Sequence, residues 1–252
     1  MKKNKKSFSR KTVLLLAASA VLLVGSAVGS TRAALTYYSE NYTAQMNMSR
    51  IGVTLQENGN DVSNRDYEGN GDWEGTVSGT LLNHLAESKI VPEQKYPEAL
   101  TVKNSGNIDT FVRVIITKYW ENPEGEKDNT LNPALIELDA PLAGWIEDES
   151  ARTTERSIYY YQTALKAGDE GNISTPLCEN IWIDGSIAEL VEQVTNEEEG
   201  TIQYIYKYND YTFVLEAEVN AVQTHNAAEA IRSAWGVDAT VSADETTITG
   251  IQ

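Results

Sequence analysis

The two histidines are the first residues to consider for metal or hydrolytic chemistry. A zinc-peptidase helix of the His-Glu-x-x-His type presents two imidazoles one turn apart, with a glutamate between them. His84 and His225 are far apart in this chain, in "LLNHLAES" and "QTHNAAEA", and neither lies in such a motif. A zinc site would need both histidines and a distant carboxylate. The spacing therefore predicts no catalytic residue and no obligatory cofactor.

One acidic stretch has part of a calcium-loop pattern. Asp66, Glu68 and Asn70 occupy positions 1, 3 and 5, and a glycine follows at position 6. Position 12 should be a bidentate glutamate, but it is Val77. One interpretation is an irregular calcium site made by Asp66, Glu68, Asn70 and Asp72. The other is that residues 57–75 form a solvated acidic loop.

Cys178 is the single cysteine of the chain. One cysteine excludes an intramolecular disulfide. The surrounding "TPLCENIW" supplies neither a base nor a positive charge that would activate a thiol. We therefore expect Cys178 to pack as a small apolar side chain.

The chain is strongly acidic. Its formal net charge is −17, and removal of the first 33 residues, which contain seven basic and no acidic residues, would make it −24. Such a charge repels nucleic acid and anionic lipid and favours solubility. We expect no nucleic-acid partner and no membrane contact outside an uncleaved signal.

The N-terminus has the pattern of an export signal. A basic segment is followed by an apolar run from Val13 to Val28 and by small residues, including Ala33 and Ala34. Cleavage after Ala33 would give a mature chain that begins at Ala34. The alternative is an uncleaved anchor, although the run is short for a membrane span.

The rest of the chain, residues 34–252, is expected to be one domain built mostly of strands. The strongest pattern is Thr110–Trp120, in which Val112, Val114 and Ile116 share one face and Phe111 and Ile115 share the other. Further strands are predicted in "EALTVKN", "ALIELD", "GWIED", "SIYYYQTAL", "TPLCENIWI", "TIQYIYKY" and "YTFVLEAEVNAVQ". Most of the tyrosines are expected to fill the core.

Helix signals are few. Residues 225–236 have Asn226 as N-cap, Glu229 three positions later and Gly236 at the end. A second short helix is expected over 186–196, and a turn in "TLLNHLAES". Many strands and few helices predict an all-β fold, an antiparallel β-sandwich or jelly roll with short helices in crossovers.

Several of these stretches resemble the TasA/camelysin family of exported β-sandwich proteins, which a SipW-type signal peptidase processes in Gram-positive bacteria. The resemblance lies in "GSTRAALTYYSENYTAQMN", "LTVKNSGNIDTFVRVIITKYW", "YYYQTALKAGDE" and "FVLEAEVNAVQTHNAAEAIRSAWGV". It implies a jelly-roll subunit of an extracellular biofilm fibre that passes its mature N-terminal segment into a neighbouring subunit.

The implied donor strand is Ala34–Met48, in which Leu35, Tyr37, Tyr42, Met46 and Met48 are the candidate strand-donor residues. Because the segment follows the signal directly, cleavage would release it and start assembly. The alternative is that residues 42–57 form the first strand of the protein's own sandwich.

The hypothesis is therefore a secreted fibre subunit in the extracellular matrix or on the cell surface, which associates with itself or with related matrix proteins. One alternative is a camelysin-like metal-dependent peptidase, and another is a monomeric adhesin that uses the acidic loop or a tyrosine face.

Overall fold

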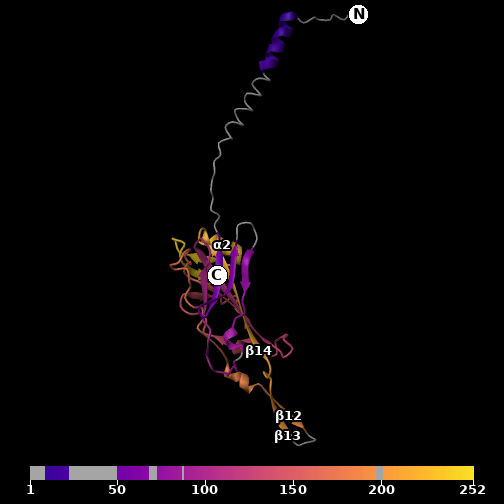
Figure 1. The fold of residues 1–252 in the computed structure, drawn as a ribbon, viewed down its shortest axis with the longest axis vertical. Coiled ribbons are helices and arrows are strands. Elements are labelled where there is room, and N and C mark those ends of the chain that lie inside the picture. The colour runs from indigo at the N-terminus through magenta and orange to yellow at the C-terminus, as the bar shows by residue number, and fades with distance from the viewer. Residues whose placement is uncertain (1–8, 23–49, 68–72, 87, 197–200) are drawn as a thin grey trace, which may run out of the picture. The chain divides into compact units, whose positions relative to one another are not determined.

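The computed structural model describes residues 9–22, 50–67, 73–86, 88–196 and 201–252 (Figure 1). The chain divides into two compact units, Met1–Asn47 and Met48–Gln252. In the first unit, residues 10–22 form an α-helix. Among the described helices, none combines the length and the apolar character that crossing a membrane requires.

The second unit is all-β in its main content, as predicted, and all of its strand pairs are antiparallel. One sheet has the order β3-β2-β1-β5. Its strands are β1 (Gly52–Glu57), β2 (Asn60–Tyr67), β3 (Trp73–Ser78) and β5 (Leu100–Asn104).

The prediction of a loop over residues 57–75 is wrong. β1 ends at Glu57, and the chain turns through Asn58 and Gly59, whose φ angles of 49° and 81° are left-handed. Asn-Gly with two positive φ angles is the favoured two-residue hairpin turn. It returns the chain into β2, so most of the acidic stretch pairs as a hairpin.

The other main sheet has the order β14-β6-β10-β9, and the short β7 also pairs with β6. Its strands are β6 (Thr110–Glu121), β7 (Lys127–Asp128), β9 (Trp145–Glu147), β10 (Arg156–Tyr161) and β14 (Thr212–Gln223). β14 pairs with β6 along its full length and is an edge strand of this sheet.

The two faces of β6, which the alternation predicted, enter two different cores, which it did not predict. Val112, Val114 and Ile116 pack with Leu55 of β1 and Leu215 of β14, so one core joins residues of both main sheets. Phe111 and Ile115 pack on the other face with helix α2 (Ala227–Trp235). Strand β6 therefore lies between the two cores.

The predicted helix over 225–236 is confirmed, and Gly236 ends it with a left-handed φ of 75°. The predicted cap at its start is wrong. Asn226 is itself left-handed, with φ 52°, and its side chain makes no capping hydrogen bond. A side-chain cap needs an extended N-cap residue, which explains the difference.

Smaller elements complete the second unit. They are β4 (Tyr96–Pro97), β8 (Ile136–Leu138), β11 (Asn180–Ile183), β12 (Val191–Asn196), β13 (Thr201–Tyr206), β15 (Ala239–Val241), β16 (Ile248–Ile251) and the 3-10 turns η1 (Asn83–Leu85), η2 (Pro133–Leu135) and η3 (Gly185–Glu189). β11 lies between β4 and β8, and β12–β13 and β15–β16 are hairpins.

The prediction of a helix over 186–196 is correct only in its first turn. Asp184 caps η3 by accepting from the Ser186 N–H, and the chain then enters β12. Val191, Val194 and Thr195 are β-branched, and pairing with β13 favours the strand. Pairing with β13 therefore determined that residues 191–196 form a strand and not a helix.

Candidate functional site

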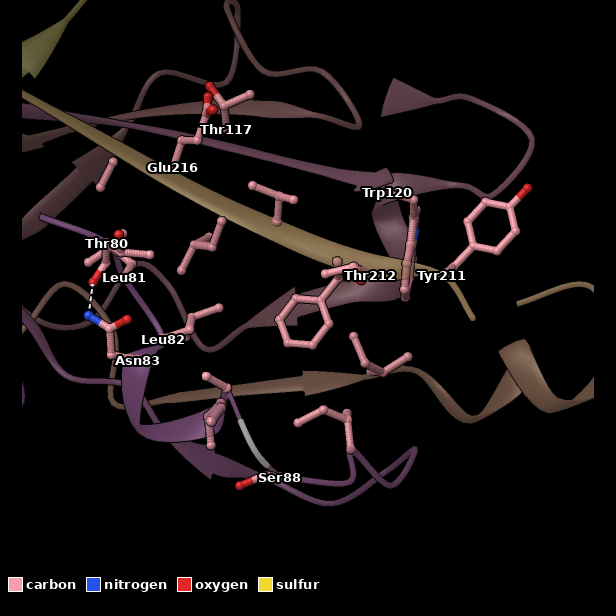
Figure 2. Close-up of a pocket in the computed structure, with 18 of the residues that line it drawn as sticks. Thr80, Leu81, Leu82, Asn83, Ser88, Thr117, Trp120, Tyr211, Thr212 and Glu216 are labelled. Atoms are coloured by element: carbon pink, nitrogen blue, oxygen red, sulfur yellow. Dashed lines mark hydrogen bonds between the residues drawn. The ribbon is translucent and has the colours of Figure 1, made fainter. Parts of the chain in front are cut away.

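A groove of about 1450 Å³ follows the edge strand β14 (Figure 2). One wall is β14 from Thr212 to Glu218, and the opposite wall is the segment from Gly79 to Ile90, which includes η1. Figure 2 shows Leu81 and Leu82 on that segment, with Trp120 near Thr212 and Tyr211 farther along the groove.

The lining of the groove mixes apolar and polar side chains, because consecutive residues of β14 from both faces of the strand contribute to it. Leu215 is buried in the main core, and Phe213 and Ala217 pack against the same core. From the opposite wall Leu82 and Leu85 also pack against this core. An extended segment with apolar side chains on one face would find complementary contacts here.

Polar groups at the edge of the groove are of two kinds. In an antiparallel pair, alternate residues direct their N–H and C=O groups away from the partner, so the outer edge of β14 offers unpaired groups. Among the described residues, no strand pairs with that edge. The carboxylates of Asp210, Glu216 and Glu218 also line the groove, together with one ammonium group, Lys89.

The wall opposite β14 is held by a close approach of the backbone. Gly79 lies so near β2 that an added Cβ would be 1.9 Å from the Val62 carbonyl oxygen. Leu82 follows with a left-handed φ of 62°, and its N–H donates to Oε1 of Glu57 at 2.6 Å. The position of this wall therefore depends on a glutamate of β1.

Glu57 belongs to a second feature, a cluster with His84 and Glu98 whose ligand atoms all lie within 4.8 Å of one another. Nδ1 of His84 is 3.8 Å from Oε1 of Glu57. Glu57 is 7% exposed and Glu98 is 0% exposed. Neither oxygen of Glu98 has a partner at full hydrogen-bond geometry, but the Glu57 carboxyl group lies close enough to share a proton with it.

The electrostatics of this cluster follow from burial. The pKa of Glu98 is raised from 4.5 to about 8, first by desolvation and then by the nearby Glu57 carboxyl group. Among the described residues, no lysine or arginine forms an ion pair with either carboxylate. Two buried carboxyl groups thus face each other without a compensating cation.

The sequence predicted one member of this cluster. His84 was considered with His225, but His225 belongs to no such group among the described residues. Glu57 and Glu98 were missed. A signal for Glu57 was present: it continues the alternation of Val53 and Leu55, so a carboxylate occupies a core position of β1.

The remaining predicted residues have separate positions. Asp66 lies in β2, paired with Glu74 of β3. Glu68, Asn70 and Asp72 lie outside the described residues, as do the predicted cleavage and donor positions, which are Ala33, Ala34, Leu35, Tyr37, Tyr42, Met46 and Met48. The calcium site and the donor strand therefore stay predictions.

Cys178 is buried, as expected. It is 0% exposed, and its Sγ contacts the carbonyl oxygen of Glu98 at 3.1 Å. Burial raises the pKa of its thiol to about 12, and nearby carboxylates, including that of Glu98, add to the shift. A thiol with so high a pKa is not a nucleophile at neutral pH.

The tyrosines divide into core and surface groups. Tyr159, Tyr160 and Tyr161 of β10 are buried, as predicted for core tyrosines. Tyr204 and Tyr206 of β13 are exposed, at 63% and 47%. The β12–β13 hairpin therefore carries an aromatic surface that the sequence did not distinguish from core.

Comparisons of the chain with known protein families, with curated proteins and with solved structures find no match. The resemblance to the TasA/camelysin family stays a prediction.

Proposed function

We propose that this protein is a secreted structural subunit of an extracellular matrix or cell-surface fibre. In this proposal, cleavage after Ala33 frees the segment Ala34–Met48, which then adds as a strand to the sheet of a neighbouring copy. The observation that carries the proposal is the groove beside β14, an edge strand whose apolar side chains Phe213, Leu215 and Ala217 are among those that line it. Strand addition to an exposed sheet edge is an established mode of peptide recognition.

The dimensions of the groove and of the segment are compatible. Seven residues of β14, Thr212 to Glu218, line the groove. At roughly 3.3 Å per residue, an added strand needs about 23 Å of extended chain there. The segment Ala34–Met48 has 15 residues, which exceeds this length.

The chemistry of the segment also suits the groove. Tyr42, Met46 and Met48 are at even spacing, so a strand would present all three on one face. The segment has one acidic residue, Glu40, and therefore brings little repulsion toward the carboxylates of Glu216 and Glu218. The backbone would supply affinity, and these side chains would supply selectivity.

The finer architecture belongs to the same proposal. We interpret the two main sheets, which share one core, as the two layers of a β-sandwich of jelly-roll type. A donated strand beside β14 would extend one layer and cover the apolar part of the lining between the layers.

Sedimentation tests the proposal. A chain that begins at Ala34 should form high-mass species, and a chain that begins at Ser49 should remain a folded monomer. A face-specific pair gives a matched control: the double variant Met46→Asp/Met48→Asp should lose assembly, whereas Gln45→Asp/Asn47→Asp adds the same charge to the opposite face and should assemble. Assembly without Ala34–Met48 would refute the strand-addition proposal.

A second candidate function, a monomeric adhesin, is favoured by the exposed side chains of the β12–β13 hairpin, Ile202, Tyr204 and Tyr206. Binding of glycans or host proteins by a chain that forms no filaments in electron microscopy would support it. The third candidate, a metal-dependent peptidase, predicts hydrolysis of a peptide that a chelator abolishes.

A further inference from the structure

The cluster of Glu57, His84 and Glu98 is a second feature that the fibre proposal does not use. Two carboxylic acids are buried at one place, and Glu98 has no partner at full hydrogen-bond geometry, apart from a proton that it can share with Glu57. A buried charge is costly unless it is paired or coordinates a metal. The fold thus buries the carboxyl group of Glu98, and a bound cation or a proton would neutralise its negative charge.

The ring of His84 is oriented as a ligand. Its Nε2 lies 2.8 Å from the carbonyl oxygen of Pro97. Because a carbonyl oxygen accepts but does not donate, Nε2 carries the proton and Nδ1 holds the free lone pair. Nδ1 is the nitrogen near Glu57. A metal-binding histidine typically donates its other N–H to a backbone carbonyl in this way.

Glu57 is oriented in a similar manner. The Leu82 N–H fixes its Oε1 from the side of η1. Hydrogen bonds to ligating carboxylates position them for a metal and are part of a complete site. Two of the three side chains therefore already have the outer contacts of a coordination site.

We propose that Glu57, His84 and Glu98 form a binding site for a divalent cation of the zinc class. One imidazole and two carboxylates form a nitrogen and oxygen donor set, which suits Zn²⁺, whereas Ca²⁺ takes six to eight oxygen ligands. Three protein ligands leave a coordination position for water.

The geometry requires a small contraction. Ligands at about 2.0–2.1 Å in a tetrahedral site lie roughly 3.3 Å from one another, whereas the three ligand atoms here lie within 4.8 Å. His84 is on the short turn η1 and is the exposed member of the three, so it can move toward the buried glutamates. The contraction would draw η1 toward β1.

Cation binding would thereby affect the groove. The residues on both sides of His84, Asn83 and Leu85, line it. A cation that joins η1 to Glu57 of β1 and to Glu98 would fix the wall opposite β14. Assembly would then depend on the metal. This consequence rests on the proposed function, whereas cation binding itself does not.

Calorimetry of the full-length chain with zinc chloride at pH 8 tests the site. We expect one Zn²⁺ per chain and a higher Tm with zinc. His84→Ala and Glu98→Gln should each weaken binding at least tenfold, while His225→Ala, which removes the other histidine, should leave it unchanged. Calcium chloride should give a much smaller rise in Tm.

Two outcomes would overturn the proposal. One is no heat and no change in Tm with zinc at pH 8. The other is binding that neither His84→Ala nor Glu98→Gln weakens, which would place the ion on the acidic surface. Because Glu98→Gln replaces a buried carboxyl group with a nearly isosteric neutral amide, it should fold even if His84→Ala does not. If a chain that begins at Ala34 binds zinc but does not sediment as high-mass species, assembly alone would be refuted.

Discussion

The main-chain N–H of Leu82 donates a 2.6 Å hydrogen bond to Oε1 of Glu57. This bond connects the groove wall to the buried carboxylate cluster, and it holds Leu82 in a left-handed conformation that is costly for a residue with a branched side chain. The groove wall opposite β14 and the cluster of Glu57, His84 and Glu98 are thus connected by a direct hydrogen bond.

The pH dependence of stability follows from Glu98. Its pKa is raised from 4.5 to about 8 in the folded state by burial and then by Glu57. Between these values the folded state holds a proton that the unfolded state has lost, so the unfolding free energy falls as pH rises through this window. The slope from this group approaches ~1.4 kcal/mol per pH unit.

Urea unfolding from pH 4.5 to pH 8.5, with a chelator present, would measure this effect. Other carboxyl groups also titrate in this range, so the relevant quantity is the difference between the wild-type protein and Glu98→Gln. We expect the variant to gain stability relative to wild type as pH rises. Parallel curves for the two proteins would contradict the assignment.

The groove can be blocked from the side of β14. Ala217 lines it, and Ala217→Arg would place a long cation where the added strand must lie. We expect this variant to remain a folded monomer while the parent assembles, as measured by sedimentation and circular dichroism. Ala228→Arg on the exposed side of α2 adds the same charge and is the control. Normal assembly of Ala217→Arg would argue against the groove as the docking site.

Truncating a buried aromatic side chain and an exposed one should affect stability differently. Phe111 is 0% exposed in the core with α2, so Phe111→Ala should lower the unfolding free energy by about 3–5 kcal/mol. Tyr204→Ala, on the exposed hairpin, should change it by less than about 0.5 kcal/mol. Equal losses in urea unfolding would show that β13 is packed in solution.

Cys178 should be unreactive in the folded protein. It is 0% exposed, and the pKa of its thiol is about 12. A thiol reagent at pH 8 should label the urea-unfolded chain and leave the native chain unlabelled over the same time. Rapid labelling without unfolding would show that the contact with the Glu98 carbonyl opens readily.

Local pattern was sufficient for the strongest strand and for the end of one helix. The alternation of Thr110–Trp120 predicted β6 and which of its residues share a face, and the Gly236 signal predicted the end of α2. These features depend on neighbours two to four residues apart, which the sequence displays directly. Residues 191–196 were predicted incorrectly because their strand depends on pairing with β13.

By itself, the sequence determined the all-β class, the strand alternation, the charge and the burial of Cys178. Only the tertiary structure decided that Glu57, His84 and Glu98 meet and that residues 79–90 lie across a groove from β14. The physical reason is that alternation specifies which face of a strand is buried, whereas the strand that covers this face is chosen by long-range packing. A carboxylate at a core position was visible in β1, but its partners became known only with the fold.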